Sequence, residues 1–482
     1  MPWLHIAYLL IFALDLVTAC VIIFVERHNA AVTWAWLMVL LFIPVGGFIL
    51  YVLFGQHISR YRLARFRLRN APWVARAAER QHRQVESGHV VYKEPAAQRH
   101  ADLIALNLKT AYAVYTEDNR VDVFVRGVDK FEALFEDIRQ AKDHIHLEYY
   151  IFRPDDLGER FVRLLAEKAR EGVEVRLLYD AVGCAWTPKS FFEPLVRDGG
   201  EVAAFFPSRI PYVNLRMNNR NHRKIAVVDG RVAYVGGFNV GDEYLGKDER
   251  FGFWRDTHLR IEGSAILELQ SIFLLDWNSS SKHPIEFEDR YFPRVHGRPG
   301  ATGMQVVASG PDTDWEQIRN AYIKMIYAAK ESIYIQTPYF VPDDSLLTAL
   351  KIASLSGVDV KVMLPGKPDH LWVFWASRFY LGDLLQAGVQ CYLYRDGFLH
   401  AKMVVTDREL ASVGTANIDI RSFKLNFEVN ALIFDRDKSG HLADLFERDL
   451  EKCDRLTLEQ YRSRPRAERI MESCARLLSP IL

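Results

Sequence analysis

The chain has 482 residues, which is more than one hydrophobic core usually supports, so we expect two domains or one duplicated domain. Its 61 basic residues balance its 61 acidic residues, which argues against bulk binding to nucleic acid. The five cysteines lie far apart without a CxxC pair, so neither a disulfide framework nor a cysteine zinc site is indicated, and a reducing compartment fits best.

Two long apolar segments lie within residues 1–55. Residues 4–25 carry one charge, Asp15, and residues 33–54 carry none. Each segment has 22 residues, enough for a helix rising about 1.5 Å per residue to cross a hydrocarbon core of roughly 30 Å. We therefore predict two transmembrane helices. A signal peptide is the alternative for the first segment, although it lacks a basic leader. Asp15 has either a function or a role in helix pairing or snorkelling.

Arginines dominate the chain after the second apolar segment. Basic residues concentrate on the cytoplasmic side of membrane proteins, so the main body is predicted to be cytoplasmic. The same arginines are suited to hold the chain against anionic lipid head groups. They are Arg60, Arg62, Arg65, Arg67, Arg69, Arg76, Arg80 and Arg83. Residues 56–118 are thus predicted to be a basic juxtamembrane segment and connector, with a helix at 101–111.

Strand and helix patterns alternate through the rest of the chain. In residues 119–300 they predict a strand at 122–125, a helix at 128–140, a strand at 144–151, a helix at 158–170 and a strand at 173–179. In residues 301–482 they predict a helix at 318–329, a strand at 332–336, a helix at 345–354 and a strand at 358–364. This repeated βαβ order predicts an α/β protein made of two similar halves.

Residues 221–244 gather the groups that a phosphate site needs. The motif comprises His222, Lys224 and Asp229, followed by Gly236, Gly237 and Asn239. Residues i and i+2 of a strand point the same way, so His222 and Lys224 are expected to face one cavity. The two glycines would let backbone amides approach an anion. One copy alone is equally compatible with a hairpin that carries a surface histidine and lysine.

The second half repeats this motif with the same spacing. Its copy comprises His400, Lys402 and Asp407, followed by Gly414, Thr415 and Asn417. Duplication of a scaffold would keep its strands without keeping two histidines and two lysines. We therefore predict one composite site to which both halves contribute, and neither half is expected to be catalytic alone. Asp229 and Asp407 belong to the catalytic motif, but their place in a hairpin turn favours structural hydrogen bonds over direct chemistry.

The paired HxKxxxxD motifs with their trailing glycine and asparagine resemble the phospholipase D superfamily. Two apolar N-terminal segments, the Pro-Asp-Asp turns at 154–156 and 342–344, and the run GTANIDIRSFKLNFE at 414–428 resemble bacterial cardiolipin synthases. The resemblance covers essentially the whole chain. It implies two phospholipase D-type halves, each a mixed β-sheet flanked by helices, with an N-terminal transmembrane helical hairpin.

The resemblance also implies roles for the motif residues. One histidine attacks the phosphorus and the other protonates the leaving oxygen; family precedent makes His222 the nucleophile and His400 the acid, although the two are interchangeable in sequence. The groups expected to hold the phosphate are Lys224, Lys402, Asn239 and Asn417, with support from Gly236, Gly237, Gly414 and Thr415. No metal and no cofactor is implied.

Each histidine needs a partner that fixes its tautomer, and an acid downstream of each motif is the natural candidate. Asp256 follows His222 by 34 residues, and Glu428 follows His400 by 28. Both resemble the orienting carboxylates of the family.

The implied reaction is transfer of a phosphatidyl group between two phosphatidylglycerol molecules, giving cardiolipin and glycerol through a phosphatidyl-histidine. The implied partners are phosphatidylglycerol and anionic membrane lipids, without nucleic acid, and the oligomeric state stays open, a homo-oligomer included. The implied location is the bacterial inner (cell) membrane, as a multi-pass protein. Four alternatives share features of this chain: a hydrolytic phospholipase D, another phosphatidyltransferase such as a phosphatidylserine-forming enzyme, a superfamily nuclease and a non-enzymatic membrane scaffold.

Two further segments are candidates for contact with a bilayer. Residues 370–385 are rich in aromatic side chains, and residues 466–482 form a basic amphipathic tail. Core packing is the alternative for both. A basic loop with Arg209, Arg216, Arg220 and Arg223 would attract anionic head groups, or would simply be solvated.

Overall fold

A computed structural model of the chain describes residues 2–24, 30–51, 72–88, 90–207, 218–293, 297, 299–313 and 315–479. It consists of two compact units. One comprises Met1–Arg60 with Pro207–Asn219, and the other comprises Tyr61–Phe206 with Arg220–Leu482.

The described N-terminal residues form helices α1 (Pro2–Phe24), α2 (Ala30–Phe42) and α3 (Pro44–Leu50). The second predicted apolar helix is therefore divided. Pro44 lacks a backbone N–H and begins a new helix, so the hydrogen-bond ladder of α2 does not continue through it. Within the part of the chain that the structure describes, no helix is long and apolar enough to cross a membrane. The predicted pair of transmembrane helices is thus not found.

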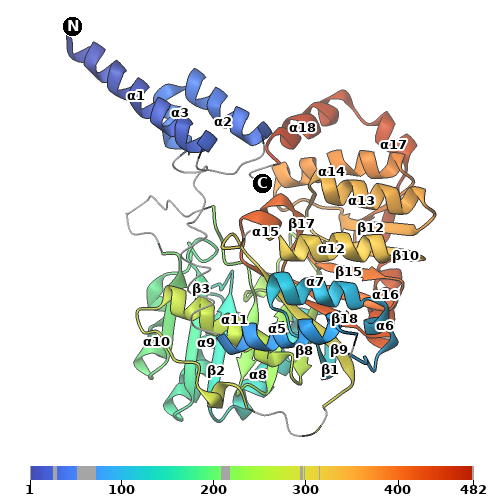
Figure 1. Cartoon of the computed structure of the whole chain (residues 1–482). Coiled ribbons are helices and arrows are strands. Elements are labelled where there is room, and N and C mark those ends of the chain that lie inside the picture. Colours follow the sequence, from blue (N-terminus) through green and yellow to red (C-terminus); the bar gives the residue numbers. More distant parts are fainter. Residues whose placement is uncertain are drawn as a thin grey trace. The chain divides into compact units, whose positions relative to one another are not determined.

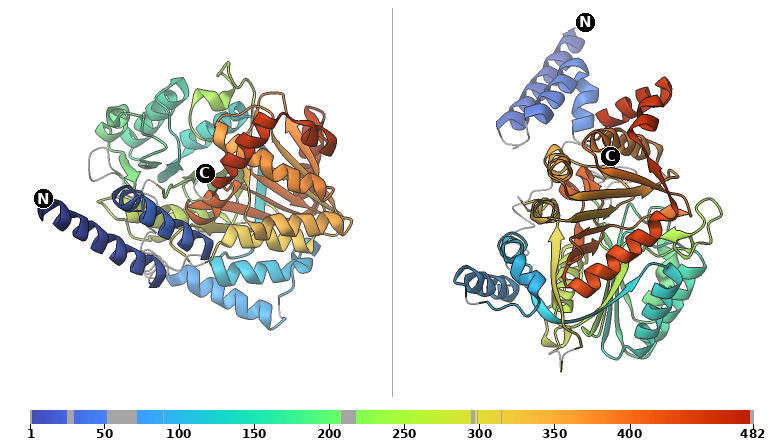
Figure 2. Two further views of the ribbon diagram at one scale, coloured as in Figure 1. Left: turned by 90° about the horizontal axis from the view of Figure 1, so that it is seen from above. Right: turned by 90° about the vertical axis from the view of Figure 1, so that its right-hand side faces the viewer.

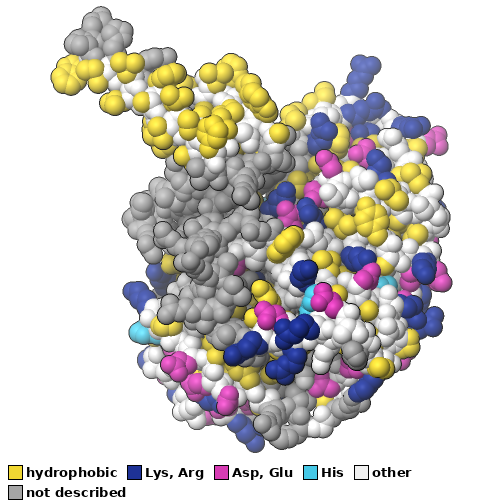
Figure 3. Space-filling view, viewed as in Figure 1, with side chains coloured by type: hydrophobic (Ala, Val, Ile, Leu, Met, Phe, Trp, Pro, Cys, Tyr) yellow, Lys and Arg dark blue, Asp and Glu magenta, His cyan; other side chains and the backbone are white. Residues whose placement is uncertain are grey.

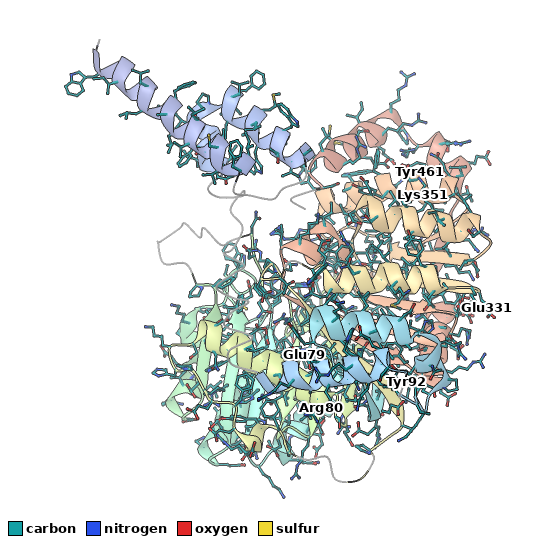
Figure 4. All side chains as sticks on the ribbon, in the orientation of Figure 1. Glu79, Arg80, Tyr92, Glu331, Lys351 and Tyr461 are labelled. Carbon is teal, nitrogen blue, oxygen red and sulfur yellow. The ribbon has the colours of Figure 1, made fainter. Side chains whose placement is uncertain are left out.

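The predicted connector packs into the core of the second half. It contains α5 (Pro72–Glu86), α6 (Pro95–Arg99) and α7 (Ala101–Ala111). Buried side chains such as Ala78 and Leu108 pack in one cluster with Ile318 of the second half, and Figure 2 shows α7 beside α12. Figure 4 labels Glu79 and Arg80 on α5. The predicted arginines from Arg60 to Arg69 lie outside the described residues.

A 15-stranded sheet organises the larger unit. The strands of the first half are β1 (Thr116–Phe124), β2 (His144–Tyr149), β3 (Glu174–Asp180), β4 (Glu201–Phe205), β5 (Ile225–Val228), β6 (Val232–Gly236) and β8 (His258–Glu262). The strands of the second half are β9 (Thr302–Ser309), β10 (Ser332–Gln336), β12 (Asp359–Pro365), β13 (Gln390–Tyr394), β15 (Met403–Thr406), β16 (Leu410–Gly414), β18 (Glu428–Phe434) and β19 (Cys453–Leu456).

The strand order is nearly a palindrome about the pairing of β1 with β9. Outward from that pairing, one side runs β1-β8-β6-β5-β2-β3-β4 and the other runs β9-β18-β16-β15-β10-β12-β13, with β19 at the edge. β5 and β6 form the predicted hairpin, and β15 and β16 form its copy. The mixed α/β fold with two similar halves is thereby confirmed.

Helices flank the sheet in both halves (Figure 1). The first half carries α8 (Gly127–Gln140), α9 (Asp156–Arg170), α10 (Glu193–Arg197) and α11 (Ile266–Ser280). The second carries α12 (Gln317–Ala328), α13 (Asp344–Leu355), α14 (Leu371–Gln386), α15 (Ile420–Lys424), α16 (Arg436–Leu450), α17 (Leu458–Ser463) and α18 (Arg466–Leu477). The repeated Pro-Asp-Asp turns are helix N-caps. Asp155 accepts a hydrogen bond from Gly158 N at 3.1 Å, and Asp343 accepts one from Leu346 N at 3.0 Å.

The two halves share an apolar core. Ile225 and Val227 of β5 are fully buried and belong to one cluster with Met403 and Val405 of β15. Ala226 and Val228 point to the opposite side and pack in the core of the first half. Both faces of β5 are therefore covered, which explains its uninterrupted apolar sequence and fixes the two motif hairpins against each other.

Candidate active site

The two histidine motifs meet because each is paired with a segment of the other half. His222 N donates to Phe427 O at 2.9 Å, and His400 N donates to Arg255 O at 2.7 Å. The second contact continues a short parallel pairing of β14 (Phe398–Leu399) with β7 (Trp254–Arg255). In both cases the acceptor residue immediately precedes a buried carboxylate.

The histidine–carboxylate pairs therefore cross between the halves. His222 Nδ1 lies 3.0 Å from both carboxylate oxygens of Glu428, and His400 Nδ1 lies 2.7 Å from Asp256 Oδ2. The sequence order implied the opposite pairing, within each half, and that expectation is wrong. A carboxylate accepts hydrogen bonds, so Nδ1 of each imidazole carries the proton and Nε2 is left for a substrate.

Both lysines of the motifs are buried next to their histidines. Lys224 Nζ donates to His222 O at 2.5 Å, and Lys402 Nζ donates to His400 O at 2.6 Å. Lys402 Nζ also lies 3.1 Å from His400 Nε2. Burial lowers the pKa of Lys224 to about 7 and that of Lys402 to about 8, although neighbouring carboxylates oppose this effect. An anion that enters the site restores the charged form of both.

Burial also keeps the two imidazoles neutral. It lowers the pKa of His222 to about 4, an effect that Glu428 opposes and Lys224 reinforces. It lowers the pKa of His400 to about 4 as well, with Lys402 reinforcing and Asp256 opposing. Near neutral pH both imidazoles are therefore neutral, and the additional negative charge of an incoming anionic group favours the imidazolium.

The position after the first motif glycine is Gly237 in the first copy and Thr415 in the second. This difference corresponds to the length of the neighbouring acid, which is an aspartate beside Gly237 and a glutamate beside Thr415. Thr415 Oγ1 donates to Glu428 Oε2 at 2.6 Å. At the matching position a Cβ on Gly237 would lie 1.9 Å from Asp256 Oδ1. The shorter aspartate side chain holds its carboxylate closer to the backbone, so only glycine leaves room for it.

The amides of Gly237 and Gly414 donate within the protein and are not offered to an anion, contrary to our prediction. Gly237 N donates to Thr257 O at 3.0 Å, and Gly414 N donates to Lys402 O at 3.3 Å. A Cβ at Gly236 would lie 2.5 Å from the backbone of His258. These glycines permit close strand packing instead.

The two asparagines have different surroundings. Asn239 Oδ1 accepts from Ile151 N at 3.1 Å, and its Nδ2 donates to Tyr244 Oη at 3.0 Å. Asn417 N donates to Ser422 Oγ at 3.2 Å, while its buried Oδ1 has no hydrogen-bond partner among the described residues. Asn239 thus ties the loop after β2 to the motif.

Asp229 and Asp407 hold the motif turns to neighbouring backbone. The Asp229 carboxylate accepts from the backbone N–H groups of Lys142, Asp143 and His144 at 2.8–3.0 Å. The Asp407 carboxylate accepts from those of Lys330, Glu331 and Ser332 at 2.8 Å. Each carboxylate therefore anchors the turn to the start of the adjoining strand, as the turn position favoured.

Replacing either aspartate with alanine is expected to cost stability more than chemistry. Asp229→Ala or Asp407→Ala removes the acceptor of three N–H groups, so we expect a loss of about 2–3 kcal/mol in the free energy of unfolding. Urea denaturation measures this loss, and kcat per folded molecule should be retained. Asp229→Asn, which keeps one acceptor oxygen, is the matched control with a smaller loss. Loss of turnover at unchanged stability would instead assign the aspartates to catalysis.

Aromatic rings line both histidines, which the sequence patterns did not reveal. The ring centroid of Tyr150 lies 4.8 Å from that of His222, and that of Trp254 lies 5.2 Å from that of His400. Tyr150 directly follows β2, before the first Pro-Asp-Asp turn, and Trp254 precedes Asp256 by two residues. Proximity in sequence to a motif element is the signal that could have identified them.

The sequence suggested that Arg223 belongs to a basic loop that attracts head groups or is solvated, but the structure shows neither. Arg223 is fully buried and forms an ion pair with Asp276, and its Nε donates to Glu428 O at 3.2 Å. It thus fixes the backbone of the segment that carries Glu428. Arg209 and Arg216 lie outside the described residues.

No group of three or more His, Cys, Asp or Glu side chains suited to a metal ion occurs in the described part of the chain. The titratable groups that converge here are two imidazoles, two carboxylates and two lysines. Groups of these kinds are able to provide a nucleophile, a proton donor and positive charge for an anionic ester.

Comparisons with known proteins agree on the family. A family model described as "Cardiolipin synthase, PLD-like domain" matches residues 134–268 and 322–450, and a phospholipase D–nuclease N-terminal model matches residues 13–56. The chain is 49% identical over 480 residues to the cardiolipin synthase of Listeria innocua, covering 99% of each chain. It is 52% identical over 474 residues to the major cardiolipin synthase of Bacillus subtilis, covering 98% of each.

The fold resembles the crystal structure of phosphatidylserine synthase from Haemophilus influenzae, with a TM-score of 0.60 and 14% identity over 80% of this chain and 100% of that one. That likeness concerns the fold alone. The family models and the full-length relatives together show that the chain belongs to the bacterial cardiolipin synthases of the phospholipase D superfamily.

Proposed function

We propose that the enzyme transfers a phosphatidyl group from one phosphatidylglycerol to a second one, forming cardiolipin and releasing glycerol. The observation that carries this proposal is the pair of crossed histidine–carboxylate contacts, His222 with Glu428 and His400 with Asp256. Two oriented imidazoles of this kind provide the nucleophile and the acid that a two-step exchange at phosphorus requires.

In the first step, His222 Nε2 attacks the phosphorus of the donor lipid. The bond from phosphorus to the glycerol oxygen breaks, and His400 gives that oxygen a proton, so glycerol leaves and a phosphatidyl-histidine remains. Charge grows on the non-bridging oxygens during attack, and the ammonium groups of Lys224 and Lys402 offset it. The incoming phosphate favours the imidazolium form that His400 needs.

In the second step, His400 is neutral and acts as the base. It takes the proton of the free head-group hydroxyl of the acceptor lipid, whose oxygen attacks the phosphorus. The bond from phosphorus to His222 breaks, cardiolipin forms, and the enzyme regains its starting protonation state. Reversal of these steps uses the same groups.

Both histidines have little contact with water. Each is 8% exposed, and the rings of Tyr150 and Trp254 cover them. Exclusion of water favours transfer to a lipid hydroxyl over hydrolysis.

The products formed in vesicles test this function. Purified enzyme in phosphatidylglycerol vesicles is expected to yield cardiolipin and glycerol, resolved by mass spectrometry. Phosphatidic acid as the sole product would make the enzyme a hydrolase, and cleavage of DNA instead of lipid would make it a nuclease.

The buried lysines predict a specific pH dependence. Their pKa values of about 7 and 8 lie below the ordinary value, so the free enzyme loses both charges as the pH rises through this range. We expect kcat/KM for phosphatidylglycerol to fall above about pH 8, while kcat persists to higher pH because bound phosphate raises both pKa values. In Lys224→Arg, whose guanidinium stays charged, the fall in kcat/KM should shift to higher pH. A kcat/KM that is flat to pH 10 would contradict this account.

We also propose that the catalytic unit docks on an anionic membrane surface. On the packed helices α14 and α18, exposed apolar side chains lie beside arginines: Leu371, Trp372, Ile470, Met471 and Leu477, with Arg466, Arg469 and Arg476. Figure 3 shows basic side chains gathered over the α17–α18 corner. Apolar insertion combined with basic charge is the usual basis of interfacial binding.

Replacing two apolar residues of this surface with aspartate is expected to weaken docking. Ile470→Asp with Leu477→Asp should reduce binding to phosphatidylglycerol vesicles by about tenfold, as measured by co-sedimentation. Val91→Asp, at a side chain that is 87% exposed in the loop between α5 and α6, is the matched control. Equal binding by all variants would place the docking surface elsewhere.

A further inference from the structure

A pair of arginines lies beside His222 and outside the histidine–lysine centre. Residues 426–428 contact the backbone of both arginines and the ring of His222. Asn426 N donates to Arg421 O at 3.0 Å, and Phe427 N donates to Arg220 O at 2.8 Å. The carboxylate of the third residue of this segment holds the ring of His222. Arg421, Arg220 and His222 are therefore ordered along one short stretch of backbone.

The two guanidinium groups are close enough to repel each other electrostatically. Burial and the charge of Arg220 lower the pKa of Arg421, against the opposing effect of nearby acids. Both arginines also act on Tyr150, where they oppose the rise in pKa caused by burial. Since the ring of Tyr150 contacts that of His222, this places the pair next to the nucleophile.

One donor of Arg220 is unpaired among the described residues. Nη1 of Arg220 is buried and has no hydrogen-bond partner among the described residues. The nearby carboxylate of Asp180 is occupied by backbone N–H groups, those of Val182, Gly183 and Asn221 at 2.8–2.9 Å. A buried cationic donor without an acceptor costs free energy, which an anionic oxygen would recover.

We propose that Arg220 and Arg421 bind the phosphate of the acceptor lipid, a second phosphodiester distinct from the one that reacts. This inference rests on the proposed function. Joining two phosphatidylglycerol molecules brings two negative phosphates into one site, and Lys224 and Lys402 are engaged by the first. The acceptor phosphate lies one glycerol away from the attacking hydroxyl, so it needs its own cations. Guanidinium groups suit it because they bind phosphate in a bidentate manner.

This subsite selects the acceptor. A lipid whose phosphate is held beside His222 places its free hydroxyl near the phosphatidyl-histidine, whereas water and neutral alcohols gain nothing from the arginines. Charge recognition of the acceptor thereby favours cardiolipin over other products.

Two assays on the full-length enzyme separate acceptor binding from donor chemistry. One measures cardiolipin formation in phosphatidylglycerol vesicles, and the other measures exchange of the phosphatidylglycerol head group with isotope-labelled glycerol, a neutral acceptor. In Arg220→Gln and Arg421→Gln we expect the ratio of cardiolipin formation to glycerol exchange to fall about tenfold or more. Arg153→Gln is the matched control: this arginine pairs with Glu243, and its variant should keep the wild-type ratio.

Two outcomes would overturn the subsite. An equal fall in both reactions would assign the arginines to the donor phosphate, and an unchanged ratio would remove them from binding. If a glutamine variant does not fold, Arg220→Lys and Arg421→Lys keep the charge but lose the bidentate geometry; their ratio should also fall, and an unchanged ratio there refutes the proposal. Wild-type enzyme that exchanges glycerol but makes no cardiolipin would refute the proposed function itself.

Discussion

His222→Ala and His400→Ala are each expected to abolish cardiolipin formation, with losses of at least about 10³-fold in kcat. Each variant lacks one of the two imidazoles that the exchange at phosphorus uses, while the crossed backbone contacts that hold the site remain. The measurement is cardiolipin formed in phosphatidylglycerol vesicles, with thermal unfolding as the check on folding. His441→Ala, at an exposed histidine on α16, is the matched control.

A donor lipid with a nitrophenol head group distinguishes the two roles. Nitrophenolate leaves without a proton, so His400→Ala should still release one equivalent in a burst and retain a phosphatidyl group on His222, detectable by intact-protein mass spectrometry. His222→Ala should give no burst. The reverse result would exchange the two roles, and full activity of either variant would overturn the two-histidine mechanism.

Glu428→Gln and Asp256→Asn are expected to reduce kcat by about 10²-fold or more, because each removes the group that fixes an imidazole tautomer. The crossed pairing predicts which step each variant slows. With the nitrophenyl donor, Glu428→Gln should slow formation of the covalent intermediate, since Glu428 orients His222. Asp256→Asn should leave the burst and slow the later turnover, since Asp256 orients His400.

This difference tests positioning and not merely folding. If each acid served the histidine of its own half, the two variants would show the opposite kinetics. An independent readout is the downfield imidazole N–H resonance in proton NMR, which should change for His222 only in the Glu428 variant and for His400 only in the Asp256 variant.

Local patterns predicted much of the fold. The strand at 332–336 and the helix at 101–111 match β10 and α7 residue for residue, because side-chain periodicity and turn residues are local signals. Other element ends shifted by a few residues. The second predicted apolar helix is divided in the structure, because a 22-residue apolar count does not reveal where Pro44 interrupts a helix.

By itself, the sequence determined the two βαβ halves, the duplicated motif and hence the chemical groups of the site. Only the tertiary structure decided how those groups pair. His222 and Glu428 are separated by 206 positions and meet through strand contacts between the halves, which periodicity cannot encode. The same packing placed Arg220 and Arg421 near His222, buried Arg223, and turned the motif aspartates toward backbone amides. Which imidazole is held by which acid depends on distances across the shared core, and those exist only once the two halves have folded together.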